Sequence, residues 1–223
     1  MKCLIGVAAA SMVISIAACA GGAGNYSQPE ALNSFYVEGA LGYANTGWSD
    51  IMGDSVGSNS SPIDMAYTKN ANGGFAWGAD IGYNLRPWLA VELGVLQLPT
   101  TDMSYTMSGQ ELGSGSVKSC AFYLAGKLTE MVTDNFALFG KAGVNYENTV
   151  VDDALGVSSG SDTYGLVTNH NYGPFFAAGV GYKVNSNIMV NAQFARTSGK
   201  SDHTANHFSP NANVTTVGVQ YTI

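Results

Sequence analysis

Charged residues are scarce in this chain of 223 residues, because Asp, Glu, Lys and Arg together make up only 11% of it. Disordered chains are usually far more charged, so the composition argues against a disordered protein. Nine of the charged residues are basic and sixteen are acidic, which gives a formal net charge of −7. An acidic balance disfavours binding to nucleic acid, and we expect no such partner.

Long apolar runs are also missing, except at the N-terminus. There, one positive charge in Met1-Lys2 precedes an almost wholly apolar run from Leu4 to Ala18, and small residues follow it. This pattern predicts a secretory signal peptide over residues 1–20. No other segment approaches the roughly 20 continuous apolar residues of a transmembrane helix. We therefore expect an exported protein that is not a helical membrane protein.

The remaining chain is rich in glycine, with 28 in total, and in short segments that alternate apolar and small or polar residues. The last segment runs to the C-terminus and places Val217, Val219, Tyr221 and Ile223 on one face. Such a strand, ending in an aromatic and a terminal hydrophobe, indicates contact with lipid. We interpret these four residues as a C-terminal assembly signal for the barrel-assembly machinery. A bilayer cannot satisfy an open sheet edge, so this strand must pair with the first one.

Eight such alternating segments occur, each long enough to cross a bilayer as a tilted strand of about ten residues. They span residues 35–44, 75–85, 89–95, 119–128, 136–146, 175–184, 188–195 and 214–223. The predicted fold class is all-β: an eight-stranded antiparallel up-and-down transmembrane β-barrel over residues 34–223. Residues 21–33 are predicted to be a flexible N-terminal leader.

Short turns alternate with longer polar segments between these strands. The predicted loops are Asn45 to Gly73, Pro99 to Gly115, Asn148 to Asn171 and Ser198 to Ala212. Outer-membrane barrels keep short turns in the periplasm and long loops outside. We therefore expect an integral protein of the outer membrane of a Gram-negative bacterium, with extracellular loops and both termini periplasmic.

Aromatic residues recur near both ends of the predicted strands, as in the interfacial girdles of membrane proteins. The girdle residues are Phe35, Tyr83, Trp88, Phe136, Tyr182 and Tyr221 toward the turns, and Tyr43, Phe75, Trp77, Tyr146 and Phe194 toward the loops.

Processing of the N-terminus has two alternatives. Cleavage after Ala20 satisfies the small-x-small rule, but Ile16-Ala17-Ala18-Cys19 also fits a lipoprotein box with Cys19 acylated. We favour cleavage after Ala20, because a barrel already has its own membrane anchor. The mature chain would then keep Cys120 alone and form no internal disulfide.

Several short motifs resemble the transmembrane barrel of the outer-membrane protein A family. They are Ile81-Gly82-Tyr83-Asn84-Leu85-Arg86-Pro87-Trp88, Glu92-Leu93-Gly94, Lys127-Leu128, Gly173-Pro174, Gly179-Val180-Gly181-Tyr182 and Val217-Gly218-Val219-Gln220-Tyr221. The resemblance spans almost the whole mature chain. Ile223 replaces the terminal Phe of the family, and the periplasmic domain that often follows the barrel is absent, so the resemblance implies no tether to the cell wall.

The resemblance also implies a ladder of charged residues inside the barrel. Glu92, Lys127 and Lys141 match family positions, and the inward faces of neighbouring strands add Glu38 and Asp80. The expected polar network in the lumen comprises Glu38, Asp80, Glu92, Lys127, Lys141, Asn191 and Gln193. An acid and a base about 4 Å apart attract by about 4 kcal/mol at an effective dielectric near 20. Since an eight-stranded barrel is narrow, we expect these residues to fill the lumen.

The loops carry three histidines and many acidic residues without a recognisable ligand spacing. His170, His203 and His207 are therefore interpreted as solvated, and we expect no metal, cofactor or catalytic residue. The expected function is a structural or surface-interaction role through the loops, which would bind a host or surface ligand. The other expected partners are outer-membrane lipid and lipopolysaccharide, and the protein is expected to be a monomer. The alternatives are a small passive pore and a lipid-modifying enzyme, for which Ser201-Asp202-His203 supplies the residue types.

Overall fold

The structure is a computed structural model that describes residues 33–46, 63–69, 73–107, 110–155, 167–198 and 211–223. The predicted signal peptide and all of the predicted leader except Asn33 lie outside these residues. The strands are β1 Phe35–Thr46, β2 Ile63–Lys69, β3 Gly74–Arg86, β4 Leu89–Gln97, β5 Thr101–Met107, β6 Gln110–Met131, β7 Phe136–Leu155, β8 Val167–Lys183, β9 Ile188–Thr197 and β10 Ala212–Thr222. In this described part, no helix is long and apolar enough to cross a membrane.

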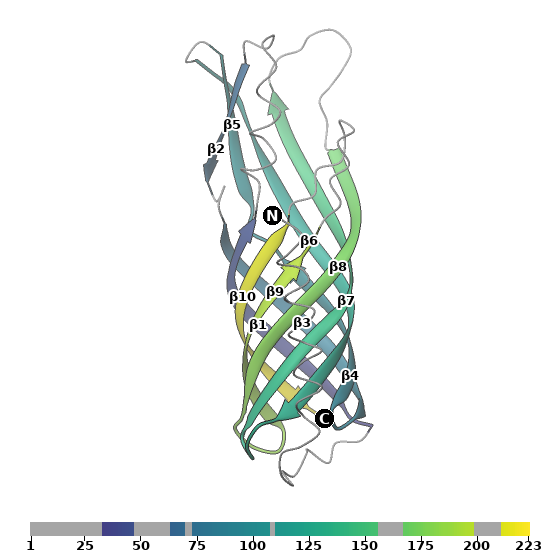
Figure 1. The fold of residues 1–223 in the computed structure, drawn as a ribbon. Coiled ribbons are helices and arrows are strands. Elements are labelled where there is room, and N and C mark those ends of the chain that lie inside the picture. The colour runs from purple at the N-terminus through teal and green to yellow at the C-terminus, as the bar shows by residue number, and fades with distance from the viewer. Residues whose placement is uncertain (1–32, 47–62, 70–72, 108–109, 156–166, 199–210) are drawn as a thin grey trace, which may run out of the picture.

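Eight of the strands form a closed antiparallel barrel (Figure 1). They follow the order β6-β4-β3-β1-β10-β9-β8-β7, and a further pairing of β6 with β7 closes the circle. The last strand pairs with the first from Thr222 opposite Tyr36 to Ala212 opposite Thr46. The sheet therefore has no open edge at this level, as a bilayer requires. The predicted fold and its closing strand are confirmed.

The register of the pairs sets the tilt of the strands. A path round the barrel can be followed by stepping on each strand to the directly opposed residue of the next strand. Starting at Asn84 on β3, this path passes through Lys127, Lys141 and Ala195, and it returns to β3 at Gly74, ten residues from its start. For eight strands, this offset corresponds to a tilt of roughly 40° and a backbone radius of about 8 Å. Inward side chains from opposite walls of such a barrel can touch.

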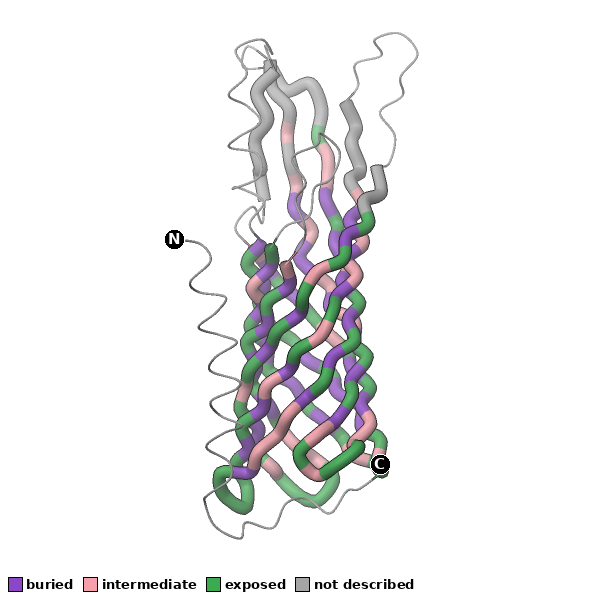
Figure 2. Tube along the Cα trace, turned by 45° about the vertical axis from the view of Figure 1, so that its right-hand side comes forward, coloured by how far each residue is buried: buried purple, intermediate pink, exposed green. Residues whose placement is uncertain are grey.

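Side chains alternate between two surroundings along each barrel strand (Figure 2). On β1, Tyr36 and Glu38 are buried in the lumen, whereas Val37 and Leu41 point outward and are exposed. Monomeric soluble proteins rarely expose a contiguous apolar surface of this extent. The outward face is therefore the lipid-contacting belt, and the alternation predicted for the eight strands is confirmed.

Aromatic pairs mark both edges of this belt. At the turn end, the ring centroids of Phe35 and Tyr83 are 4.7 Å apart, and Phe136 and Tyr182 form a second contact between β7 and β8. At the loop end, Tyr43 lies opposite Phe75 on the neighbouring strand. Tyr and Phe rings at these two levels are typical of the girdles of membrane barrels.

Three of the predicted loops are partly strand, so the sequence-based prediction was wrong there. Strand β2 lies within the predicted loop Asn45 to Gly73 and pairs with β5, which lies within Pro99 to Gly115. Strand β6 is 22 residues long and also extends into Pro99 to Gly115. Strand β7, which is 20 residues long, and strand β8 extend into Asn148 to Asn171. The first residues of β6, Gln110 to Ser116, do not alternate between apolar and polar, so periodicity gave no strand signal there. Strands β2 and β5 do alternate, with Ile63, Met65 and Tyr67 on one face of β2, so that signal was available and the prediction missed it.

Candidate functional site

The charged residues of the lumen come from five neighbouring strands. The register places Glu38 on β1 opposite Asp80 on β3, and Lys127 on β6 opposite Lys141 on β7. Like charges directly opposite each other destabilise a sheet unless other groups neutralise them. Glu92 on β4, between the two like-charged pairs, provides that neutralisation. We call Glu38, Asp80, Glu92, Lys127 and Lys141 the lumen network.

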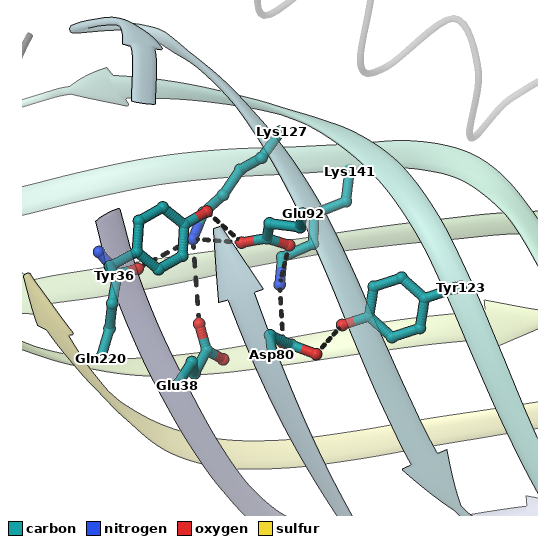
Figure 3. Close-up of polar contacts among 8 residues, drawn as sticks. All are labelled: Tyr36, Glu38, Asp80, Glu92, Tyr123, Lys127, Lys141 and Gln220. Atoms are coloured by element: carbon teal, nitrogen blue, oxygen red, sulfur yellow. Dashed lines mark hydrogen bonds and ion pairs between the residues drawn. The ribbon is translucent and has the colours of Figure 1, made fainter. Parts of the chain in front are cut away.

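Four ion pairs connect the lumen network (Figure 3). Glu92 is fully buried, with Oε1 at 3.0 Å from Lys127 Nζ and Oε2 at 2.7 Å from Lys141 Nζ. The outer acids lie further away, at 3.9 Å for Glu38 to Lys127 and 3.5 Å for Asp80 to Lys141. Glu92 is therefore the central bridge of the network, and its loss would affect both lysines.

Neutral side chains complete the contacts of the network. The Tyr36 hydroxyl donates to Glu92 Oε1 at 2.5 Å, the Tyr123 hydroxyl donates to Asp80, and Lys127 Nζ donates to Gln220 Oε1 at 3.0 Å. These three residues were not among the predicted members of the network. The alternation of inward and outward residues along each strand was the available signal, because it places Tyr36 on the same inward face of β1 as Glu38.

Two glycines make room for the tyrosine rings. A Cβ at Gly82 would meet the ring of Tyr36, and a Cβ at Gly94 would meet Asp80 and the ring of Tyr123. Phe139 lies beneath both lysines, with its ring centroid 4.9 Å from Lys127 Nζ and 5.7 Å from Lys141 Nζ. Cation–π attraction adds to the ion pairs at such distances.

Asn191 and Gln193 were also predicted for the network, but the structure does not join them to it. Both are buried on β9. Within the described residues, neither nitrogen nor oxygen of the Asn191 amide has a hydrogen-bond partner, and the same holds for the Gln193 carbonyl oxygen. They therefore line the lumen beside the lumen network.

An apolar layer fills the lumen on the loop side of the lumen network. The rings of Tyr123 and Phe175 stack there with centroids 4.0 Å apart and planes 10° from parallel. Buried Leu96, Leu98 and Val214 belong to the same cluster, together with alanines from the surrounding strands. On the turn side, a pocket of about 650 Å³, including its opening to solvent, reaches Lys127. Between this turn-end pocket and the loop end of the barrel lie the lumen network and then the apolar layer, which also lines a smaller pocket beside Tyr123 and Phe175.

The other predicted residues lie apart from the lumen. Val217, Val219, Tyr221 and Ile223 are all exposed on the outward face of the closing strand and at its end. His170 is on β8 and outside the barrel, where its Nδ1 is 2.6 Å from the Tyr146 hydroxyl. His203, His207 and Ser201-Asp202-His203 lie outside the described residues. Among the residues whose positions are described, no group of three His, Cys, Asp or Glu side chains is arranged to hold a metal ion.

A closed barrel with an apolar outer belt and a buried charged network in its lumen defines a small membrane-spanning β-barrel protein. The model of the OmpA-like transmembrane domain family matches residues 30–223. The chain belongs to this family and is an integral outer-membrane protein.

Comparison with individual proteins agrees with this assignment. An uncharacterized protein of Coxiella burnetii (strain RSA 493 / Nine Mile phase I) is 26% identical over 252 residues, which cover 99% of this chain and 98% of that protein. The outer-membrane protein OprG from Pseudomonas aeruginosa is similar in structure, with a TM-score of 0.57, 15% identity, and coverage of 88% of this chain and 98% of OprG. Neisserial surface protein A has a TM-score of 0.53 at 14% identity, covering 85% of this chain and 97% of that one. At these identities the two structures show a shared fold.

Proposed function

We propose that this protein is a sealed outer-membrane scaffold. It acts at the cell surface through its loops and through the strand ends that extend past the loop-side edge of the lipid-contacting belt. In this proposal the loops are extracellular and both termini are periplasmic. The observation that carries it is the length of β6 and β7, which are 22 and 20 residues long where about ten residues cross a bilayer. The surplus of about ten residues per strand would stand some 25 Å above the belt.

The paired strands also support a recognition role. Strands β2 and β5 extend the sheet along β6, and β8 continues beside β7 up to Val167 opposite Val151. A hydrogen-bonded sheet holds its side chains in fixed positions, and binding residues are often carried by segments on a rigid scaffold. A structural role confined to the membrane would not need this extension.

A small passive pore and a lipid-modifying enzyme are the alternatives. The lumen network and the apolar layer both argue against an open path for ions. No described group of residues favours catalysis over recognition, so we do not propose an enzyme.

The proposal is tested by shortening the extension while the barrel stays intact. Thr149 on β7 lies opposite Asn169 on β8, so replacing residues 150–168 with Asn-Gly leaves a short hairpin above the belt. Cells that express this variant should contain wild-type amounts of heat-modifiable, folded barrel. They should lose the adhesion to host cells or solid surfaces that the wild-type protein confers.

The matched control replaces the turn-end residues Asn185-Ser186-Asn187 with Gly-Asn-Gly, which leaves the extension unchanged. This control should keep its adhesion. If cells with the shortened variant adhere as well as wild-type cells, or if deletion of the whole protein changes no surface property, the proposed role is wrong.

A further inference from the structure

One positive charge lies outside the barrel at the loop-side edge of the lipid-contacting belt. Arg196 on β9 is exposed, and its neighbours Ala195 and Thr197 are buried, so its side chain points outward. Its cross-strand partner on β8 is Phe176, an outward aromatic residue that is 44% exposed. Arg196 is therefore the first outward residue of β9 beyond the apolar belt.

Two carboxamides continue from Arg196 across the next two strands, each about 3 Å nearer the loop end because the strands are tilted. Asn213 on β10 lies directly opposite Arg196, and Asn45 on β1 lies directly opposite Asn213. Both amides point outward, because the flanking Ala212, Val214, Ala44 and Thr46 are buried. Residues directly opposed in a sheet have Cβ atoms about 5 Å apart. A guanidinium and two amides thus form one short row, and we call Arg196, Asn213 and Asn45 the polar row.

The other side of the barrel differs at the same edge. There the outward row across β6, β7 and β8 is Phe122, Tyr146 and Tyr172, which lie directly opposite one another. Such rings are the ordinary solution for the interface between lipid and water. Over β9, β10 and β1, which lie side by side in the barrel (Figure 1), the corresponding row is polar, and the outward aromatic residues Phe194 and Tyr43 lie two residues further from the loop end.

The guanidinium has no protein counter-charge in the described part of the chain. All ion pairs found there belong to Lys127 and Lys141 in the lumen. The outward positions of β9, β10 and β1 carry no carboxylate. An Arg side chain at the edge of the hydrocarbon region extends toward the headgroups, where phosphate is the anion available to it.

We propose that the polar row binds the phosphate group of a lipid headgroup in the leaflet at the loop end of the barrel. The planar guanidinium of Arg196 would donate two parallel hydrogen bonds to phosphate oxygens, as arginine does with such anions. The amide nitrogens of Asn213 and Asn45 would donate to the remaining oxygens. This site is distinct from the surface role proposed above and does not depend on it.

The test measures binding of diphosphoryl lipid A to the purified, folded protein in a non-ionic detergent, with bound lipid counted by native mass spectrometry. Arg196→Ala should weaken binding about fivefold, as expected for one basic residue near an anionic headgroup. Arg196→Lys should retain part of the affinity, and Asn213→Ala should lose about twofold. Arg86→Ala is the matched control, because Arg86 is exposed at the turn end of β3, and it should bind as the wild type does.

Two further arms identify the ligand. Lipid A without its phosphates should bind weakly to every variant, and millimolar inorganic phosphate should not displace diphosphoryl lipid A. Wild-type affinity in both Arg196→Ala and Arg196→Gln would overturn the proposal, as would equal binding of the dephosphorylated lipid. Full displacement by inorganic phosphate would show a site for a free anion and would also overturn it. Each variant is first checked for heat-modifiable migration, and Arg196→Lys provides the comparison if Arg196→Ala fails to fold.

Discussion

Replacing Glu92 by Gln should be the most damaging single change in the lumen that keeps side-chain volume constant. The carboxylate of Glu92 bridges Lys127 and Lys141 at 3.0 and 2.7 Å, and no part of its side chain is exposed. Removing one partner from a buried ion pair usually costs about 3–5 kcal/mol, because the other charge remains buried without its counter-charge. Here each lysine keeps one more distant acid, at 3.9 Å for Lys127 and 3.5 Å for Lys141. We therefore expect a loss near the lower end of this range, about 3 kcal/mol.

The assay is reversible unfolding by urea or guanidinium in lipid vesicles, followed by tryptophan fluorescence. Asp80→Asn is the comparison, because Asp80 makes one ion pair, at 3.5 Å, and accepts one hydrogen bond from Tyr123. The free energy of unfolding should fall by about 1–2 kcal/mol in that variant, as for one weakened charged hydrogen bond. If Glu92→Gln is as stable as the wild type, or if Asp80→Asn is the less stable of the two, the central bridging role of Glu92 is wrong.

Three further outcomes are expected. Gly94→Ala places a methyl group against the ring of Tyr123 and should lower the free energy of unfolding by about 1–3 kcal/mol. Gly39→Ala, with no atom within 4 Å of the new Cβ, should change this free energy little, and equal losses of stability in the two variants would contradict the packing. Tyr221→Asp puts a charge on the lipid face and removes the aromatic of the assembly signal, so the amount of folded protein in the outer membrane should drop sharply, and wild-type amounts would count against that signal. Trypsin added to intact cells should cut after Lys200, in the last predicted loop, and not after Lys183 at the turn end of β8; the reverse result would invert the orientation.

The barrel was predictable from sequence because lipid and lumen impose opposite demands on alternate residues. On β1, Val37 faces lipid and Glu38 faces the lumen, and the same alternation marks the other barrel strands. Beyond the belt this difference disappears. The upper half of β6 therefore carries no signal that separates it from a polar loop, whereas β5 alternates Met103, Tyr105 and Met107 with polar residues and could have been recognised.

The members of the lumen network were predictable, but their contacts were not. Alternation places Lys127 and Lys141 inward, and it does the same for Tyr36 and Tyr123. Which groups meet across the barrel depends on the ten-residue offset of the register, which is a property of the closed sheet and not of any single strand. The apolar layer between Tyr123 and Phe175 joins β6 to β8 and was missed for the same reason.

The electrical conductance of the purified protein in a planar bilayer tests most directly whether the barrel is a sealed scaffold. If the lumen network and the apolar layer block the lumen in series, as we propose, the inserted protein should give no steady conductance steps, although a porin inserted under the same conditions conducts. A large, steady, cation-selective conductance of the unmutated protein would contradict the sealed lumen and favour a pore.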